Sequence, residues 1–164
     1  MPDQPIIRRS NQQVTLDELL AHVDALAGAV AIPMNVDAER CFADDPAGVA
    51  RTVELVADAG AAGCSIEEYD PRDGSIDTLE VAVERVGAAA DAATERGMVL
   101  TARAENHLFG LGDLDDTIMR PRAYRETGAK VLYAPGLTRT STYLSAAIPG
   151  AYLDATFASE RASP

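Results

Sequence analysis

Short apolar segments that recur at nearly equal intervals constrain the fold of this chain more than any other feature. Their starts lie near residues 30, 63, 98 and 131. The interval of about 33 to 35 residues between successive starts is the length of one strand, one helix and the loops that join them. Strands that alternate with helices in this way form parallel sheets with right-handed crossovers. The repeat therefore predicts an α/β fold.

Helix signals fill the stretches before and between these segments. Each predicted helix begins at a capping residue, and most carry apolar residues at helical spacing. The predicted helices run from Leu16 to Ala27, from the Asp44–Pro46 cap to Gly60, from the Asp77–Glu80 cap to Gly97, and from Asp113 to about Thr127. Pro121 lies inside the last of them, where it removes a hydrogen bond, so we expect a kink or a restart there.

Two architectures agree with this order of elements. The predicted strands are Val30–Val36, Gly63–Glu67, Met98–Arg103, Lys130–Ala134 and Ala151–Leu153. One architecture is a partial (β/α)8 TIM-type barrel of about five parallel strands with helices, and the other is an open doubly wound parallel sheet. The spacing alone does not separate them. Residues 1–14 are expected to form a loose N-terminal arm, residues 15–157 the domain, and residues 158–164 a frayed C-terminal tail.

Charge and cysteine content exclude several classes of protein. The formal net charge is −12, and no block of Lys or Arg could follow a phosphate backbone, so neither nucleic acid nor an anionic membrane is an expected partner. Cys41 and Cys64 are too few for a disulfide framework, and we interpret them as packing residues in a cytoplasmic protein. No apolar run approaches the length that spans a membrane.

Chemically capable residues follow the apolar segments directly. They are Asp37 and Glu39, then Glu67 and Glu68, then Arg103, Glu105, Asn106 and His107. In either architecture the carboxyl ends of parallel strands meet at one edge, where ligands bind. Carboxylates without Cys or His ligands suit a hard cation, which favours Mg²⁺ over Zn²⁺. The fork of Arg103 suits a substrate carboxylate or phosphate, although the residue could instead serve only as an ion-pair partner of the acids.

Four motifs, in this order, resemble those of the isocitrate lyase/phosphoenolpyruvate mutase superfamily. They are NVDAERCFA (Asn35–Ala43), GCSIEE (Gly63–Glu68), LTARAENH (Leu100–His107) and VLYAPGL (Val131–Leu137). The resemblance implies a (β/α)8 barrel that uses Mg²⁺ and makes, breaks or rearranges C–C or P–C bonds beside a 2-oxo acid, through an enolate. It therefore favours the barrel over the open sheet.

The resemblance also implies residue roles. Asp37 resembles the direct metal ligand, Glu39 the second acid, Glu67 the glutamate that reaches the metal through water, and Arg103 the arginine that holds the substrate carboxylate. We accordingly assign as metal ligands Asp37, Glu39 and Glu67, as candidate catalytic residues Arg103, Glu105 and His107, and as substrate-binding residues Arg103 and Asn106.

Departures from the family pattern are equally specific. Cys41-Phe42-Ala43 replaces the usual Gly-Tyr/Phe-Gly, which puts the tight glycine turn in doubt. Residues 68–77 contain no Lys-Lys/Arg-Cys-Gly-His loop, so no proton donor is assigned. Family members are longer, and we expect this chain to lack the first two barrel strands and the eighth. Such a partial barrel exposes sheet edges, which favours a homo-oligomer.

Three functions are compatible with these observations. The leading hypothesis is a Mg²⁺-dependent lyase or mutase acting on a small 2-oxo or 2-hydroxy carboxylic acid. The alternative is a catalytically impaired, truncated homologue that acts as a binding or structural module. A phospho-accepting open-sheet domain ranks last, because Lys130 lies at the wrong end of its strand.

Overall fold

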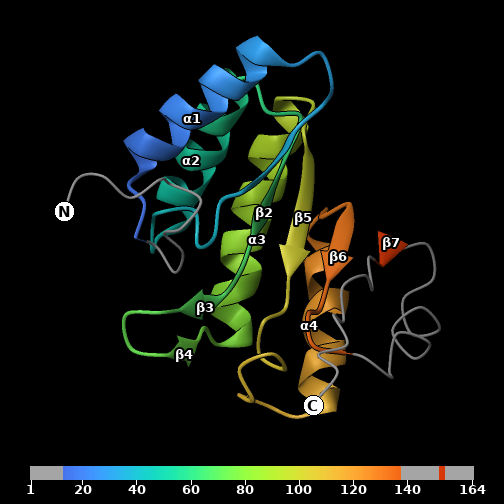
Figure 1. Cartoon of the computed structure of the whole chain (residues 1–164). Coiled ribbons are helices and arrows are strands. Elements are labelled where there is room, and N and C mark those ends of the chain that lie inside the picture. The colour runs from blue at the N-terminus through green and yellow to red at the C-terminus, as the bar shows by residue number, and fades with distance from the viewer. Residues whose placement is uncertain (1–12, 138–151, 154–164) are drawn as a thin grey trace, which may run out of the picture.

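The structure is a computed structural model that describes residues 13–137 and 152–153 (Figure 1). Its helices are α1 (Leu16–Ala29), α2 (Pro46–Asp58), α3 (Leu79–Glu95) and α4 (Leu114–Glu126). Its strands are β1 (Asn35–Asp37), β2 (Gly63–Ile66), β3 (Tyr69–Asp70), β4 (Ser75–Ile76), β5 (Val99–Arg103), β6 (Val131–Tyr133) and β7 (Tyr152–Leu153). The predicted α/β organisation is confirmed.

The order of the strands decides between the two architectures. The main sheet has the order β1-β2-β5-β6-β7, and every neighbouring pair is parallel. Each strand is therefore added beside the one before it, with no reversal of direction across the sheet. A doubly wound sheet requires such a reversal, whereas a barrel adds its strands in sequence. The open doubly wound alternative is wrong, and the partial barrel is confirmed.

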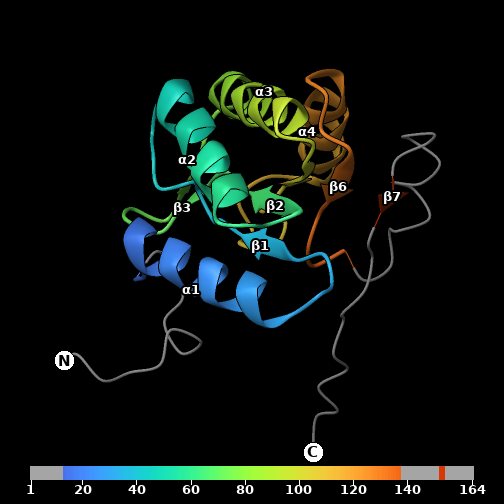
Figure 2. The same cartoon turned by 90° about the horizontal axis from the view of Figure 1, so that it is seen from above.

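Helices cover one face of this sheet. Figure 2 shows α2, α3 and α4 side by side along it, and successive helices are in contact. The strand side chains that pack against the helices are apolar and buried: Val36, Cys64, Ile66, Leu100, Ala102 and Leu132. They meet Val49, Val53 and Val56 of α2, which are fully buried. Full burial of each valine is worth about 1.5 to 3 kcal/mol, so this layer supplies much of the stability.

The opposite face of the sheet carries the polar residues. Side chains alternate along a strand, so Asp37 of β1 and Arg103 of β5 point away from the helices. Val99 lies on the same face and is 45% exposed. In a closed barrel this face is the interior, and none of the described helices covers it here. We call it the inner face.

Several helix boundaries differ slightly from those predicted. Thr15 and Glu18 form the predicted capping box, and α1 extends two residues further, to Ala29. The N-cap of α3 is Thr78, one residue after the predicted Asp77. Asp77 instead accepts hydrogen bonds from Arg40 and Arg85, because those buried guanidinium groups need an acceptor.

Pro121 neither ends nor restarts its helix. Helix α4 runs continuously through it, and the proline is itself buried. Burial of the ring offsets the hydrogen bond that the proline cannot donate. The predicted restart at this position is therefore wrong.

The first strand begins later than predicted. Val30 and Ile32 are 42% and 71% exposed, and pairing starts only at Asn35. Pro33 interrupts this stretch and has no N–H to donate to a neighbouring strand. The apolar residues before Asn35 therefore form a connection rather than a buried strand.

The β3–β4 hairpin was not predicted. It is an antiparallel pair of two-residue strands that lies beyond the end of β2 (Figure 1). The predicted last strand is present as β7. The predicted tail and nearly all of the predicted arm lie outside the described residues, so those boundaries remain predictions. None of the described helices is both long and apolar enough to cross a membrane.

Candidate active site

Asp37 ends β1 on the inner face and begins the site. Its Oδ1 accepts a hydrogen bond from the Ser65 hydroxyl of β2 at 3.0 Å and another from the Glu39 backbone N–H at 3.1 Å. The second bond closes a local turn that orders the chain just after the strand. The carboxylate is thereby held in place while 57% of the side chain remains exposed.

The loop that follows β1 has a strained backbone. Glu39, Cys41 and Phe42 have φ angles of 47°, 56° and 53° in the left-handed region. Residues other than glycine pay roughly 1 to 2 kcal/mol for this conformation. Cys41 and Phe42 therefore adopt backbone φ angles that glycine favours, although the glycines of the family motif are absent.

Hydrogen bonds from two helices hold the strained loop. The Thr52 hydroxyl of α2 donates to the Cys41 carbonyl at 2.7 Å. Arg85 of α3 donates to the carbonyls of Arg40 and Ala43, at 2.6 and 2.9 Å. Strain of this kind persists only where surrounding contacts hold the backbone in place, and these hydrogen bonds do so here.

Arg103 lies where the acids of the site converge. Its Nη1 is 2.7 Å from Asp37 Oδ2, and its Nη2 is 3.4 Å from Glu67 Oε2. Nε donates a hydrogen bond to Glu105 Oε1 at 2.7 Å, and Nη2 forms an ion pair with the same oxygen, also at 2.7 Å. The guanidinium carbon also lies 5.7 Å from the ring centroid of Tyr133, a cation–π distance. One cation therefore links carboxylates that follow three different strands.

Crowding of carboxylates perturbs the titration of the site. Burial raises the pKa of Glu67 to about 8, against the lowering effect of Arg103. The nearby carboxylates of Glu105, Asp37 and Glu39 add to this rise in pKa. The raised pKa means that Glu67 tends to keep its proton near neutral pH, because several carboxyl groups share a single arginine. A further cation would relieve this crowding.

Asn106 and His107 do not join this cluster. Asn106 is buried and donates from its amide nitrogen to Asp116 and Thr117, so it secures the start of α4. His107 is exposed on the loop after β5. The structure therefore brings together Asp37, Glu67, Arg103 and Glu105, with Glu39 beside them, and directs Asn106 elsewhere.

Three residues near the site carried no assigned role in the sequence analysis. Ser65 and Tyr133 lie within strands on the inner face, where strict alternation from the strand ends could have placed them. Glu68 is 2% exposed, and its Oε1 accepts the Glu105 backbone N–H at 2.9 Å. Burial raises the pKa of Glu68 to about 7. Glu68 thus helps to hold the backbone at Glu105 in place.

The two cysteines do not have the character of nucleophiles. Both are fully buried in the core, and burial raises the pKa of both thiols, that of Cys64 to about 12. A reactive thiol needs a lowered pKa and access to its substrate. These features support the interpretation of Cys41 and Cys64 as packing residues.

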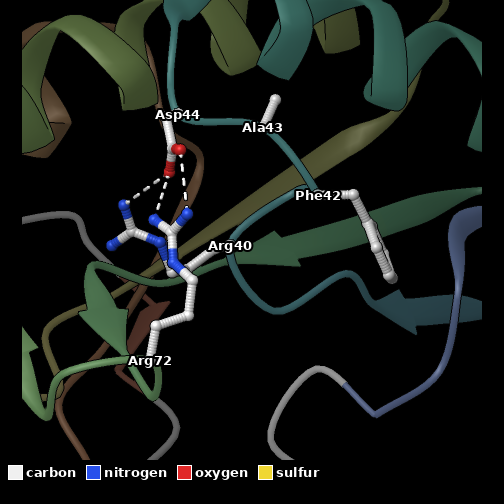
Figure 3. A pocket seen from close by; sticks show the side chains of 5 residues that line it. All are labelled: Arg40, Phe42, Ala43, Asp44 and Arg72. Atoms are coloured by element: carbon white, nitrogen blue, oxygen red, sulfur yellow. Dashed lines mark hydrogen bonds and ion pairs between the residues drawn. The ribbon is translucent and has the colours of Figure 1, made fainter.

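A separate pocket of about 200 Å³ lies beside the strained loop (Figure 3). It is lined by Arg40, Phe42, Ala43, Asp44 and Arg72. Asp44 lies between the two guanidinium groups, 2.6 Å from Arg72 and 3.5 Å from Arg40. Because Asp44 and Asp70 already pair with the arginines, we do not assign this pocket as an anion site.

The donor chemistry of the acidic cluster fits Mg²⁺. Asp37, Glu39 and Glu67 offer hard carboxylate oxygens, which this ion prefers. Within the described residues, however, no three His, Cys, Asp or Glu side chains are already grouped to hold a metal ion. The carboxylates converge on Arg103 instead.

A family model described as phosphoenolpyruvate phosphomutase matches residues 8–158. The chain belongs to this family. It is 33% identical to 2-methylisocitrate lyase of Escherichia coli K12 over 137 residues, which are 79% of this chain and 45% of that protein. It is 31% identical over 130 residues to oxaloacetate decarboxylase of Bradyrhizobium diazoefficiens, covering 76% of this chain and 44% of that protein.

Solved structures agree with this assignment. A lyase/mutase-like protein of Burkholderia cenocepacia J2315 has a TM-score of 0.80 and 44% identity, over 86% of this chain and 52% of that one. A phosphonopyruvate hydrolase in complex with oxalate and Mg²⁺ has a TM-score of 0.76 and 25% identity, over 87% of this chain and 52% of that one. The chain thus spans about half the length of the relatives it matches.

Proposed function

We propose that this chain provides a Mg²⁺-dependent site for C–C or P–C bond chemistry on a small 2-oxo or 2-hydroxy carboxylic acid. The observation that carries the proposal is the cluster of Asp37, Glu67 and Glu105 around Arg103 at the carboxyl end of the sheet. Active sites of (β/α)8 enzymes lie at this end. Membership of a family of lyases and mutases supports the same conclusion.

The residues of the cluster have distinct proposed roles. Asp37, Glu39 and Glu67 would hold Mg²⁺, which when bound supplies positive charge beside the negative charge that develops on the 2-oxo oxygen. Arg103 would hold the substrate carboxylate through its planar fork. Glu105 orients the guanidinium, because its Oε1 accepts a hydrogen bond from Nε and pairs with Nη2. His107 and Asn106 remain predicted catalytic and substrate-binding residues.

The names of the relatives support the proposed class of substrate. They describe proteins acting on 2-methylisocitrate, oxaloacetate and phosphonopyruvate, which are all small 2-hydroxy or 2-oxo acids. One of these proteins was solved with oxalate and Mg²⁺. An arginine surrounded by carboxylates suits this kind of ligand, a small dicarboxylate bound beside a divalent cation.

Calorimetry with MgCl₂ followed by a turnover assay tests the proposal. We expect saturable Mg²⁺ uptake that Asp37→Ala abolishes and that Asp91→Ala, which removes an exposed carboxylate from α3, leaves unchanged. The assay uses a panel of 2-hydroxy and 2-oxo di- and tricarboxylates with Mg²⁺ and detects 2-oxo acid products. Absence of both Mg²⁺ uptake and turnover would exclude the proposal.

The second candidate is a binding or structural module without turnover. The exposed apolar side chain of Val99 on the inner face favours it, because exposed apolar surface suits the binding of a partner. Mg²⁺ uptake without turnover on any of the acids would support this candidate. We further propose that the protein acts in the cytoplasm as a homo-oligomer that covers the exposed sheet edges.

A further inference from the structure

Arg103 occupies the position at which the acids of the site could otherwise meet. Its Nη1 contacts Asp37 Oδ2, and its Nη2 lies near both Glu67 Oε2 and Glu105 Oε1. Its Nε donates a hydrogen bond to Glu105 Oε1. The side chain is only 19% exposed, so these ion pairs are partly shielded from water. The guanidinium therefore serves as the cation of the site in the chain as it stands.

Asp37 has little capacity left for a metal ion in this arrangement. Its Oδ1 accepts from the Ser65 hydroxyl and the Glu39 backbone N–H, and its Oδ2 faces Arg103. A divalent cation that used Oδ2 would compete directly with the guanidinium. This competition explains why the described acids are not already grouped as a metal site.

The contacts of Arg103 differ in how readily they can be exchanged. The Glu105 side chain is 2% exposed and its Oε1 lies 2.7 Å from both Nε and Nη2, whereas the Asp37 side chain is 57% exposed and contacts Nη1. The contact between Arg103 and Asp37 can therefore break while the contact between Arg103 and Glu105 remains. The ring of Tyr133 still lies against the guanidinium.

We propose that Arg103 is the built-in counter-ion of the metal site and that a divalent cation displaces it from Asp37. The displacement leaves Nη1 available for a carboxylate ligand, so the metal ion binds before the acid. This inference rests on the proposed function and adds an order of binding to it. Arg103 thus has two successive partners, Asp37 in the metal-free site and the carboxylate ligand afterwards.

Titration with MgCl₂ alone tests the displacement without any turnover. Removal of the competing guanidinium in Arg103→Gln should tighten Mg²⁺ binding by about 2- to 5-fold, the upper part of the range expected for loss of a partly exposed ion pair. Arg51→Gln is the matched control, because it removes an exposed cation that pairs with Glu54 on α2. It should leave the Mg²⁺ affinity unchanged.

Oxalate binding to the unmodified protein provides a second, independent measurement. We expect oxalate to bind with Mg²⁺ present and not to bind detectably in its absence. Equal oxalate affinity with and without Mg²⁺, or an unchanged or weaker Mg²⁺ affinity in Arg103→Gln, would overturn the inference. If Asp37→Ala still abolishes Mg²⁺ uptake in that case, the proposed function stands. Absence of Mg²⁺ uptake in every variant would overturn both.

Discussion

Arg85 shows how one buried residue links the core to the candidate site. It is 2% exposed and reaches from α3 to Asp77 at 2.6 Å and to the carbonyls of Arg40 and Ala43. Buried charges are tolerated only when they are paired and hydrogen-bonded, and these partners meet that requirement. The loop after Asp37 is thereby attached to α3, one of the helices that cover the sheet.

Replacing Arg85 should destabilise the protein strongly. Arg85→Met leaves two loop carbonyls without their donor and removes one partner of Asp77, so we expect a loss of about 3 kcal/mol in the free energy of unfolding. Urea denaturation followed by circular dichroism measures this loss. Arg51→Met, at a 61% exposed position on α2, should change stability by less than about 0.5 kcal/mol. Similar losses in the two variants would contradict this reading of Arg85.

Asp70 should contribute to stability in mild acid. Hydrogen bonding to Arg72 lowers the pKa of Asp70 to about 2. Because the folded-state pKa lies below the unfolded value of about 3.9, its contribution is present above pH 4 and is lost as the pH falls towards 2. Asp70→Asn should therefore flatten the decline in melting temperature between pH 4 and 2. Asp91→Asn, at an exposed position on α3, should leave that slope as it is.

At the scale of elements, helix starts were predictable and the β3–β4 hairpin was not. Thr15 and Glu18 identify the start of α1 by local chemistry, and Pro46 places the start of α2. The two-residue strands β3 and β4 are too short to show any periodicity. Pro33 lies within an apolar run, so the late start of β1 was not apparent from the pattern. The structure of such segments depends on packing and backbone pairing, and a local sequence pattern predicts neither.

The start of α3 offers a test that separates capping from ion pairing. The Thr78 hydroxyl accepts the Val81 N–H at 3.4 Å, a long bond, so Thr78→Ala should cost about 0.5 to 1 kcal/mol. Asp77→Ala should cost more, about 3 kcal/mol, because it removes a shared partner of Arg40 and Arg85. Chemical denaturation of both variants gives the comparison. A larger loss in Thr78→Ala than in Asp77→Ala would mean that capping stabilises this helix start more than the ion pairs of Asp77 do.

At the scale of the whole molecule, strand topology explains which parts of the site were predictable. Parallel strands bring their carboxyl ends together, so Asp37, Glu67, Arg103 and Glu105 were found from their order alone. The same rule places Asn106 at that edge but says nothing of the direction of its side chain. Its orientation towards α4 depends on tertiary packing, as does the burial of polar groups in general.

The inner face gives the last prediction. Val99 is 45% exposed there, and a homo-oligomer that covers this face would bury it. Val99→Lys would then place an unpaired charge in the interface, which is strongly unfavourable, so the oligomer should dissociate to monomers. Val81→Lys is the matched control, because Val81 is 42% exposed and lies on α3, away from the inner face. Sedimentation velocity should show a smaller particle for Val99→Lys alone. Equal sedimentation of the unmodified protein and both variants would mean that no second copy covers this face.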